Sequence, residues 1–125
     1  MKRASLFLVE DEALIRMMLV DMVEELGFRV IAQAGNIVDA RSLAETEDYD
    51  LAILDINLKG ANVRPIAEII AARGLPLLFL SGYGSAGLPD GFQGMPVLNK
   101  PCTPELLKGK IDAILSSNEE PEKAP

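Results

Sequence analysis

The chain has 125 residues, a length typical of one domain with a substantial buried core. A net charge of −7 argues against nucleic acid as a partner, and the absence of histidine excludes His-based catalysis and His metal ligands. No apolar run is long enough to cross a bilayer, the N-terminus turns acidic too early for a signal peptide, and the single Cys102 cannot form an internal disulfide, so we expect a cytoplasmic protein with no membrane partner.

Strand and helix patterns alternate along the whole chain. The predicted elements are a strand at 4–9, a helix at 12–26, a strand at 28–34, a helix at 36–48, a strand at 50–55, a helix at 63–74, strands at 76–80 and 96–100, and a helix from Thr103 to about 115. In the first helix the apolar residues that recur at helical spacing, and that we expect in the core, are Leu14, Met18, Met22 and Leu26. Strict alternation predicts a parallel sheet with helices on both faces.

Polar residues follow the apolar strands directly, and in a parallel sheet these carboxyl ends collect the functional groups. They are Glu10 and Asp11 after the first strand, Asp55 after the third, Ser81 after the fourth and Lys100 after the fifth. The end of the second strand, 33–36, lacks a charge.

Three carboxylates at one sheet edge repel one another unless a hard divalent cation lies among them, and Mg²⁺ is the natural candidate. Lys100 and Ser81 add donors for an anion. A phosphoryl group fits a site with both a cation and a lysine, and Asp55 can then be the nucleophile.

The segments VEDE, LAILDINL, FLSGY and LNKP resemble, in this order, the receiver domain of bacterial two-component response regulators. The resemblance covers almost the whole chain and implies an α/β, doubly wound, five-stranded parallel sheet in the flavodoxin-like order 2-1-3-4-5. It implies that Asp55 is the phosphoacceptor. It also implies that Glu10, Asp11, Asp55 and the backbone carbonyl of Asn57 hold Mg²⁺.

The same resemblance implies that the Ser81 hydroxyl and Lys100 contact the phosphoryl group, and that the peptide bond before Pro101 is cis. Two departures from the usual receiver pattern stand out. Val97 replaces the switch aromatic three residues before the lysine, and PLLFLSGY partly matches the FATGUY subgroup of receivers, which makes Tyr83 a candidate switch.

Receivers have a fourth helix between their fourth and fifth strands, but here that segment is rich in glycine and contains a proline. Each glycine costs a helix about 1 kcal/mol relative to alanine, and an interior proline costs about 3 kcal/mol. We therefore expect this helix to be short, mobile or absent, with amide exchange across 82–94 that changes on phosphorylation.

These observations predict a receiver domain at 1–117 and a disordered tail at 118–125, with no output domain. The function they favour is a single-domain response regulator, not an enzyme beyond slow self-dephosphorylation. A histidine kinase or histidine phosphotransfer protein would donate the phosphoryl group, and the phosphorylated protein would relay it or contact an unknown downstream protein. The alternatives are a phosphorylation-independent pseudo-receiver and, less well supported because the chain has no room for a cap domain, a small-molecule phosphatase.

Overall fold

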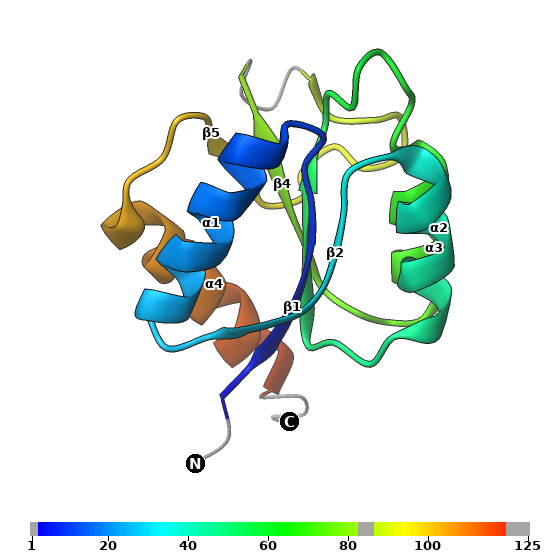
Figure 1. Ribbon diagram of the computed structural model, residues 1–125. Coiled ribbons are helices and arrows are strands. Elements are labelled where there is room, and N and C mark those ends of the chain that lie inside the picture. Colours follow the sequence, from blue (N-terminus) through cyan, green and yellow to red (C-terminus); the bar gives the residue numbers. More distant parts are fainter. Residues whose placement is uncertain (1–2, 83–86, 120–125) are drawn as a thin grey trace, which may run out of the picture.

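Five parallel strands form one sheet in the order β2-β1-β3-β4-β5, as predicted from the resemblance. A computed structural model of the protein describes residues 3–82 and 87–119. The strands are β1 (Ser5–Val9), β2 (Arg29–Ala34), β3 (Leu51–Asp55), β4 (Leu77–Ser81) and β5 (Val97–Asn99). The helices are α1 (Ala13–Glu25), α2 (Ile37–Thr46), α3 (Arg64–Ala72) and α4 (Pro104–Glu119). Helices α1 and α4 cover one face of the sheet and α2 and α3 the other (Figure 1).

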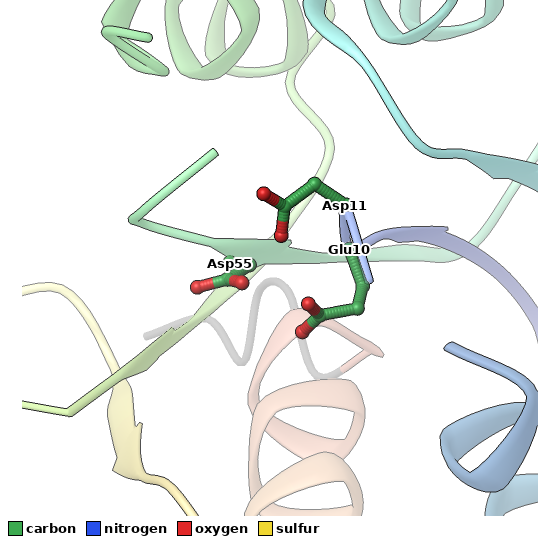
Figure 2. Close-up of side chains that lie close together, drawn as sticks. All are labelled: Glu10, Asp11 and Asp55. Carbon is green, nitrogen blue, oxygen red and sulfur yellow. The ribbon is translucent and has the colours of Figure 1, made fainter. Parts of the chain in front are cut away.

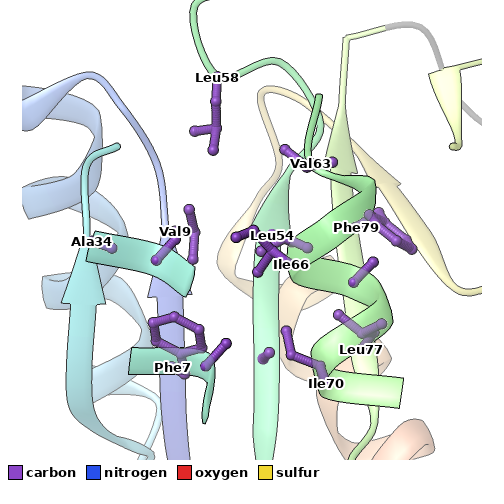
Figure 3. Packing of buried hydrophobic residues seen from close by; sticks show 14 of the residues in the cluster. Phe7, Val9, Ala34, Leu54, Leu58, Val63, Ile66, Ile70, Leu77 and Phe79 are labelled. Atoms are coloured by element: carbon purple, nitrogen blue, oxygen red, sulfur yellow. The ribbon is translucent and has the colours of Figure 1, made fainter. Parts of the chain in front are cut away.

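Both faces of the central strands are buried because successive side chains of a strand point to opposite sides. Phe7 and Val9 of β1 pack in the cluster beneath α2 and α3 (Figure 3), whereas Leu6 and Leu8 pack beneath α1 and α4. Strands β3 and β4 are buried at every position. The continuous apolar runs of the sequence therefore reflect a sheet covered on both sides, which leaves its carboxyl edge as the place for polar groups.

The predicted core face of α1 is partly wrong. Leu14 and Met18 are 69% and 58% exposed, and the buried residues of this helix are Leu19 and Val23. Apolar residues surround much of α1, so spacing alone did not identify the buried side. The helix ends as predicted before Gly27, whose φ of 103° lies in the left-handed region that glycine adopts without strain.

The described residues between β4 and β5, 82 and 87–96, contain no α-helix. The fourth helix that the fold does contain, α4, follows β5. Two buried side chains hold the β4–β5 connection to the sheet: Leu88 is 8% exposed, and Phe92 packs edge-on against Phe79 with ring centroids 6.0 Å apart. The predicted absence of a regular helix here agrees with these residues, and its mobility stays a prediction.

Helix α4 begins as the sequence predicts and ends later. The Thr103 hydroxyl accepts a hydrogen bond from the Leu106 backbone N–H at 3.2 Å, as a helix cap does. The helix continues to Glu119, so its end near 115 was placed too early and the first two residues of the expected tail are helical. Residues 120–125 lie outside the described part. Of the described helices, none combines the length and apolar character required to span a bilayer.

Candidate functional site

Three carboxylates meet at the carboxyl edge of the sheet because of its register. Val9 pairs with Leu54, so Glu10 and Asp11 at the end of β1 lie beside Asp55 at the end of β3. One oxygen of each carboxylate lies within 4.8 Å of the others, and the three side chains face one another in Figure 2. Glu10 is 0% and Asp55 is 2% exposed, so two of these charged groups are taken almost fully out of water.

Lys100 closes this site from β5. Its Nζ donates to Asp55 Oδ2 at 3.0 Å and to Glu10 Oε1 at 3.3 Å. The peptide bond between Lys100 and Pro101 is cis, as the resemblance implied. Burial acts to lower the pKa of the Lys100 ammonium, but its hydrogen bonds and charge interactions with Asp55 and Glu10 outweigh burial and raise that pKa. The lysine is therefore a fully charged donor between two buried carboxylates.

The pKa of the Glu10 carboxyl is raised by its surroundings in this site. Burial is the main cause that raises its pKa to about 7, and the Asp55 carboxylate raises it further, while the Glu12 backbone N–H and Lys100 act in the opposite direction. The site also brings three carboxylates around one ammonium, so it carries excess negative charge. A site of this kind, with oxygen ligands and excess negative charge, has the chemistry that a hard divalent cation requires.

The raised pKa of Glu10 makes a prediction about metal-free stability. The pKa is higher in the folded protein than the ordinary 4.5, so the contribution of Glu10 to stability is complete below about pH 4.5 and is lost as the pH rises through about 7. We expect the free energy of unfolding of Glu10→Gln, relative to wild type, to increase by on the order of 2 kcal/mol between about pH 5 and about pH 8.

Urea unfolding in chelator measures this difference, with the exposed Glu45→Gln as the matched control. An equal pH dependence in wild type and Glu10→Gln would contradict the assignment.

Ser81 lies at the end of β4, 2% exposed, with its backbone carbonyl accepting from the Lys100 N–H at 2.9 Å. Gly87 comes close to it from the β4–β5 connection. A Cβ atom built on Gly87 would lie 3.1 Å from the Ser81 hydroxyl oxygen, closer than most side-chain contacts allow. The absence of a side chain at Gly87 therefore lets this segment approach the hydroxyl. Sequence reasoning counted this glycine among helix breakers and did not single it out.

Asn57 and Tyr83 complete the set of predicted residues. Asn57 follows β3, and its backbone N–H donates to Asp55 Oδ1 at 3.1 Å, so each oxygen of Asp55 accepts one hydrogen bond. The metal-binding role of the Asn57 carbonyl stays a prediction. Tyr83, the candidate switch, lies outside the described residues.

Arg16 is the residue of this region that sequence reasoning missed. It belongs to α1, and its Nη1 donates to the Glu10 backbone carbonyl at 2.7 Å. Its position six residues after Glu10, one helical turn into the helix that follows the acidic pair, was the available signal.

A doubly wound parallel sheet with two buried carboxylates and a lysine at its carboxyl edge is the arrangement that the resemblance to receiver domains implied, and receiver domains are signalling phosphoacceptors rather than conventional enzymes. Residues 6–112 match the response regulator receiver domain family, and the chain belongs to that family.

Several known proteins are similar to this chain. It is 33% identical over 84 residues to the transcriptional regulatory protein PdtaR of Mycobacterium tuberculosis; the match covers 66% of this chain and 41% of PdtaR, so this chain corresponds to less than half of that relative. The solution structure of SdrG from Sphingomonas melonis is 35% identical, with a TM-score of 0.79, and the match covers 92% of this chain and 99% of SdrG. The response regulator PhyR from Brucella abortus is 30% identical, with a TM-score of 0.80 over 94% of this chain and 50% of PhyR.

Proposed function

We propose that this receiver domain accepts a phosphoryl group on Asp55 from a phosphohistidine of a histidine kinase or phosphotransfer protein. The observation that carries the proposal is the contact of Lys100 with Asp55 at 3.0 Å inside a cluster of buried carboxylates. Phosphoryl transfer requires a cation that reduces the negative charge of the site and a donor such as lysine that binds the phosphoryl oxygens.

The transfer itself follows from the chemistry of the carboxylate. An oxygen of Asp55 attacks the phosphorus, a P–O bond forms, and the P–N bond to the donor imidazole breaks with its electron pair going to nitrogen. Lys100 and the Ser81 hydroxyl donate to the phosphoryl oxygens. Glu10, Asp11, Asp55 and the Asn57 carbonyl would hold Mg²⁺, which supplies positive charge to the transferring group.

The acyl phosphate formed on Asp55 would be lost slowly to water, which limits the signal without turnover of an outside substrate. The relatives suggest output through protein contacts: a PhyR homologue from Bartonella quintana, 25% identical to this chain, is described as an anti-anti-sigma factor. We propose a protein partner for this chain as well, in the cytoplasm, either as the next acceptor in a phosphorelay or as a protein that binds the phosphorylated form. We also propose that the chain belongs to the FATGUY subgroup of receivers, on the partial match of PLLFLSGY to its motif.

The β4–β5 connection leads to a prediction about how the activated state differs from the free state. Because Gly87 lies close to the Ser81 hydroxyl, movement of that hydroxyl toward the phosphoryl group changes its packing against this segment. We expect amide exchange across 82–94 to change by several-fold when the protein is loaded with Mg²⁺ and beryllofluoride, while the middle of α4 keeps its protection. Mass-spectrometric hydrogen exchange measures both regions, and equal protection across 82–94 in the two states would contradict this mechanism.

The proposed function is tested by intact-mass analysis after incubation with a small phosphodonor and Mg²⁺. One added phosphoryl group, absent when chelator is in excess, is the expected result. If neither phosphoryl transfer nor beryllofluoride binding occurs, a pseudo-receiver that binds partners without phosphorylation replaces the proposal.

A further inference from the structure

Arg16 joins the acidic pair to the one strand end that carries no charge. Its guanidinium donates from Nη1 to the Glu10 carbonyl at 2.7 Å and from Nε to Gln33 Oε1, beyond the middle of β2, at 3.3 Å. The Glu10 N–H in turn donates to the Ala34 carbonyl at 3.1 Å. We propose that Arg16 is a positioning residue that holds the turn carrying Glu10 and Asp11, and thereby raises the affinity of the site for Mg²⁺. This inference rests on the proposed function.

Gly35 makes the arrangement possible. A Cβ atom at this residue would lie 2.6 Å from Arg16 Nη1 and 3.3 Å from its Cζ, so the guanidinium occupies space that any other residue type would fill. Gly35 does not have the left-handed φ that requires glycine at other positions of this chain. A side chain at this residue would therefore displace the Arg16 guanidinium from its place between the end of β2 and the acidic site.

The turn needs such support because β1 ends at Val9, before the two acidic residues. The contact from Arg16 to the Glu10 carbonyl is charge-assisted, a kind of hydrogen bond that is roughly twice as strong as a neutral one. Metal ligands whose outer contacts are removed lose about 10- to 100-fold in metal affinity, because the ligand atoms are no longer held in place. The same loss is expected here when Arg16 no longer holds the backbone of Glu10.

The direction in which the Mg²⁺ affinity changes when Arg16 is replaced distinguishes a positioning role from a purely electrostatic one. A positive charge close to the acidic cluster repels a cation, so by charge alone the removal of Arg16 would strengthen Mg²⁺ binding. If Arg16 positions the ligands, its removal weakens binding despite the gain in negative charge. A charge-preserving lysine lacks the planar fork that reaches both acceptors, so the lysine variant is also weakened.

The experiment is a calorimetric Mg²⁺ titration of the full chain and of Arg16→Gln, Arg16→Lys and Gly35→Ala. We expect the Kd to rise about 10-fold in each variant. In the double variant with Arg16→Gln and Gly35→Ala, we expect the rise in Kd to be smaller than the product of the two single rises, because both changes disturb the same contact. The matched control is Arg41→Gln, which removes an exposed arginine with no ion pair among the described residues and should leave the Kd unchanged.

An unchanged or lower Kd in Arg16→Gln would overturn the inference. Circular dichroism and urea unfolding check that each variant is folded. If Arg16→Gln does not fold, the Kd of Arg16→Lys for Mg²⁺, compared with that of wild type, decides the question. The rate of phosphorylation should return toward the wild-type rate at saturating Mg²⁺. If the wild type binds Mg²⁺ but accepts no phosphoryl group, only the proposed function is contradicted. If the wild type is phosphorylated but the Kd for Mg²⁺ is unchanged in the variants, only this inference is contradicted.

Discussion

Asp55→Asn accepts no phosphoryl group under conditions in which wild type gains one. The substitution keeps the size and hydrogen-bonding shape of the side chain but replaces the nucleophilic carboxylate by an amide. Asp55 is 2% exposed, and each of its carboxylate oxygens accepts a hydrogen bond, so the side chain is held in place at the carboxyl edge of the sheet beside Lys100. Intact-mass analysis after incubation with a small phosphodonor and Mg²⁺ measures whether a phosphoryl group has been added.

The control is Asp50→Asn, at the opposite end of β3. Asp50 is also a carboxylate and accepts hydrogen bonds from the Ser5 N–H and hydroxyl, but it lies away from the acidic cluster. We expect Asp50→Asn to be phosphorylated as wild type is. Equal phosphorylation of Asp55→Asn and wild type would show that the acceptor is another residue, and peptide mapping would then locate it.

Lys100→Met slows phosphorylation about 100-fold at saturating Mg²⁺. The methionine keeps most of the unbranched stem of the lysine but removes the ammonium that lies 3.0 Å from Asp55 Oδ2. Loss of one donor that stabilises transition-state charge costs about 100- to 1000-fold in rate in enzymes, and we take the lower figure because the side chain of Lys100 is 28% exposed. The rate is followed by quenching samples of the phosphodonor reaction for mass analysis.

Lys110→Met is the matched control for this substitution because Lys110 is exposed on α4 and forms no ion pair among the described residues. Its rate should equal that of wild type. If Lys100→Met were phosphorylated at the wild-type rate, Lys100 would have only a structural role, which a loss of stability in urea would then reveal.

Much of the site was accessible from sequence because of a property of parallel sheets. Apolar runs end at the same edge, so polar residues directly after Val9, Leu54 and Leu80 must gather there whatever the details of packing. The strand order agrees with the order that the resemblance to receivers implied. The absence of a regular helix in the described part of the β4–β5 connection agrees with the expectation from its glycines and proline. The apolar face of α1 could not be read in this way, since helical spacing allowed more than one side to be buried.

The amino-acid sequence by itself therefore determined the fold class and which carboxylates and lysine share the carboxyl edge of the sheet, because local periodicity and strand ends carry that information. Only the tertiary structure decided which side chains support them. The contacts of Arg16 with Glu10 and Gln33, and of Gly87 with Ser81, join elements that are distant in the folding pattern or depend on a few tenths of an ångström of space. Such contacts arise from packing in three dimensions: the spacing along the chain places Arg16 near Glu10 but does not specify which atoms its guanidinium contacts.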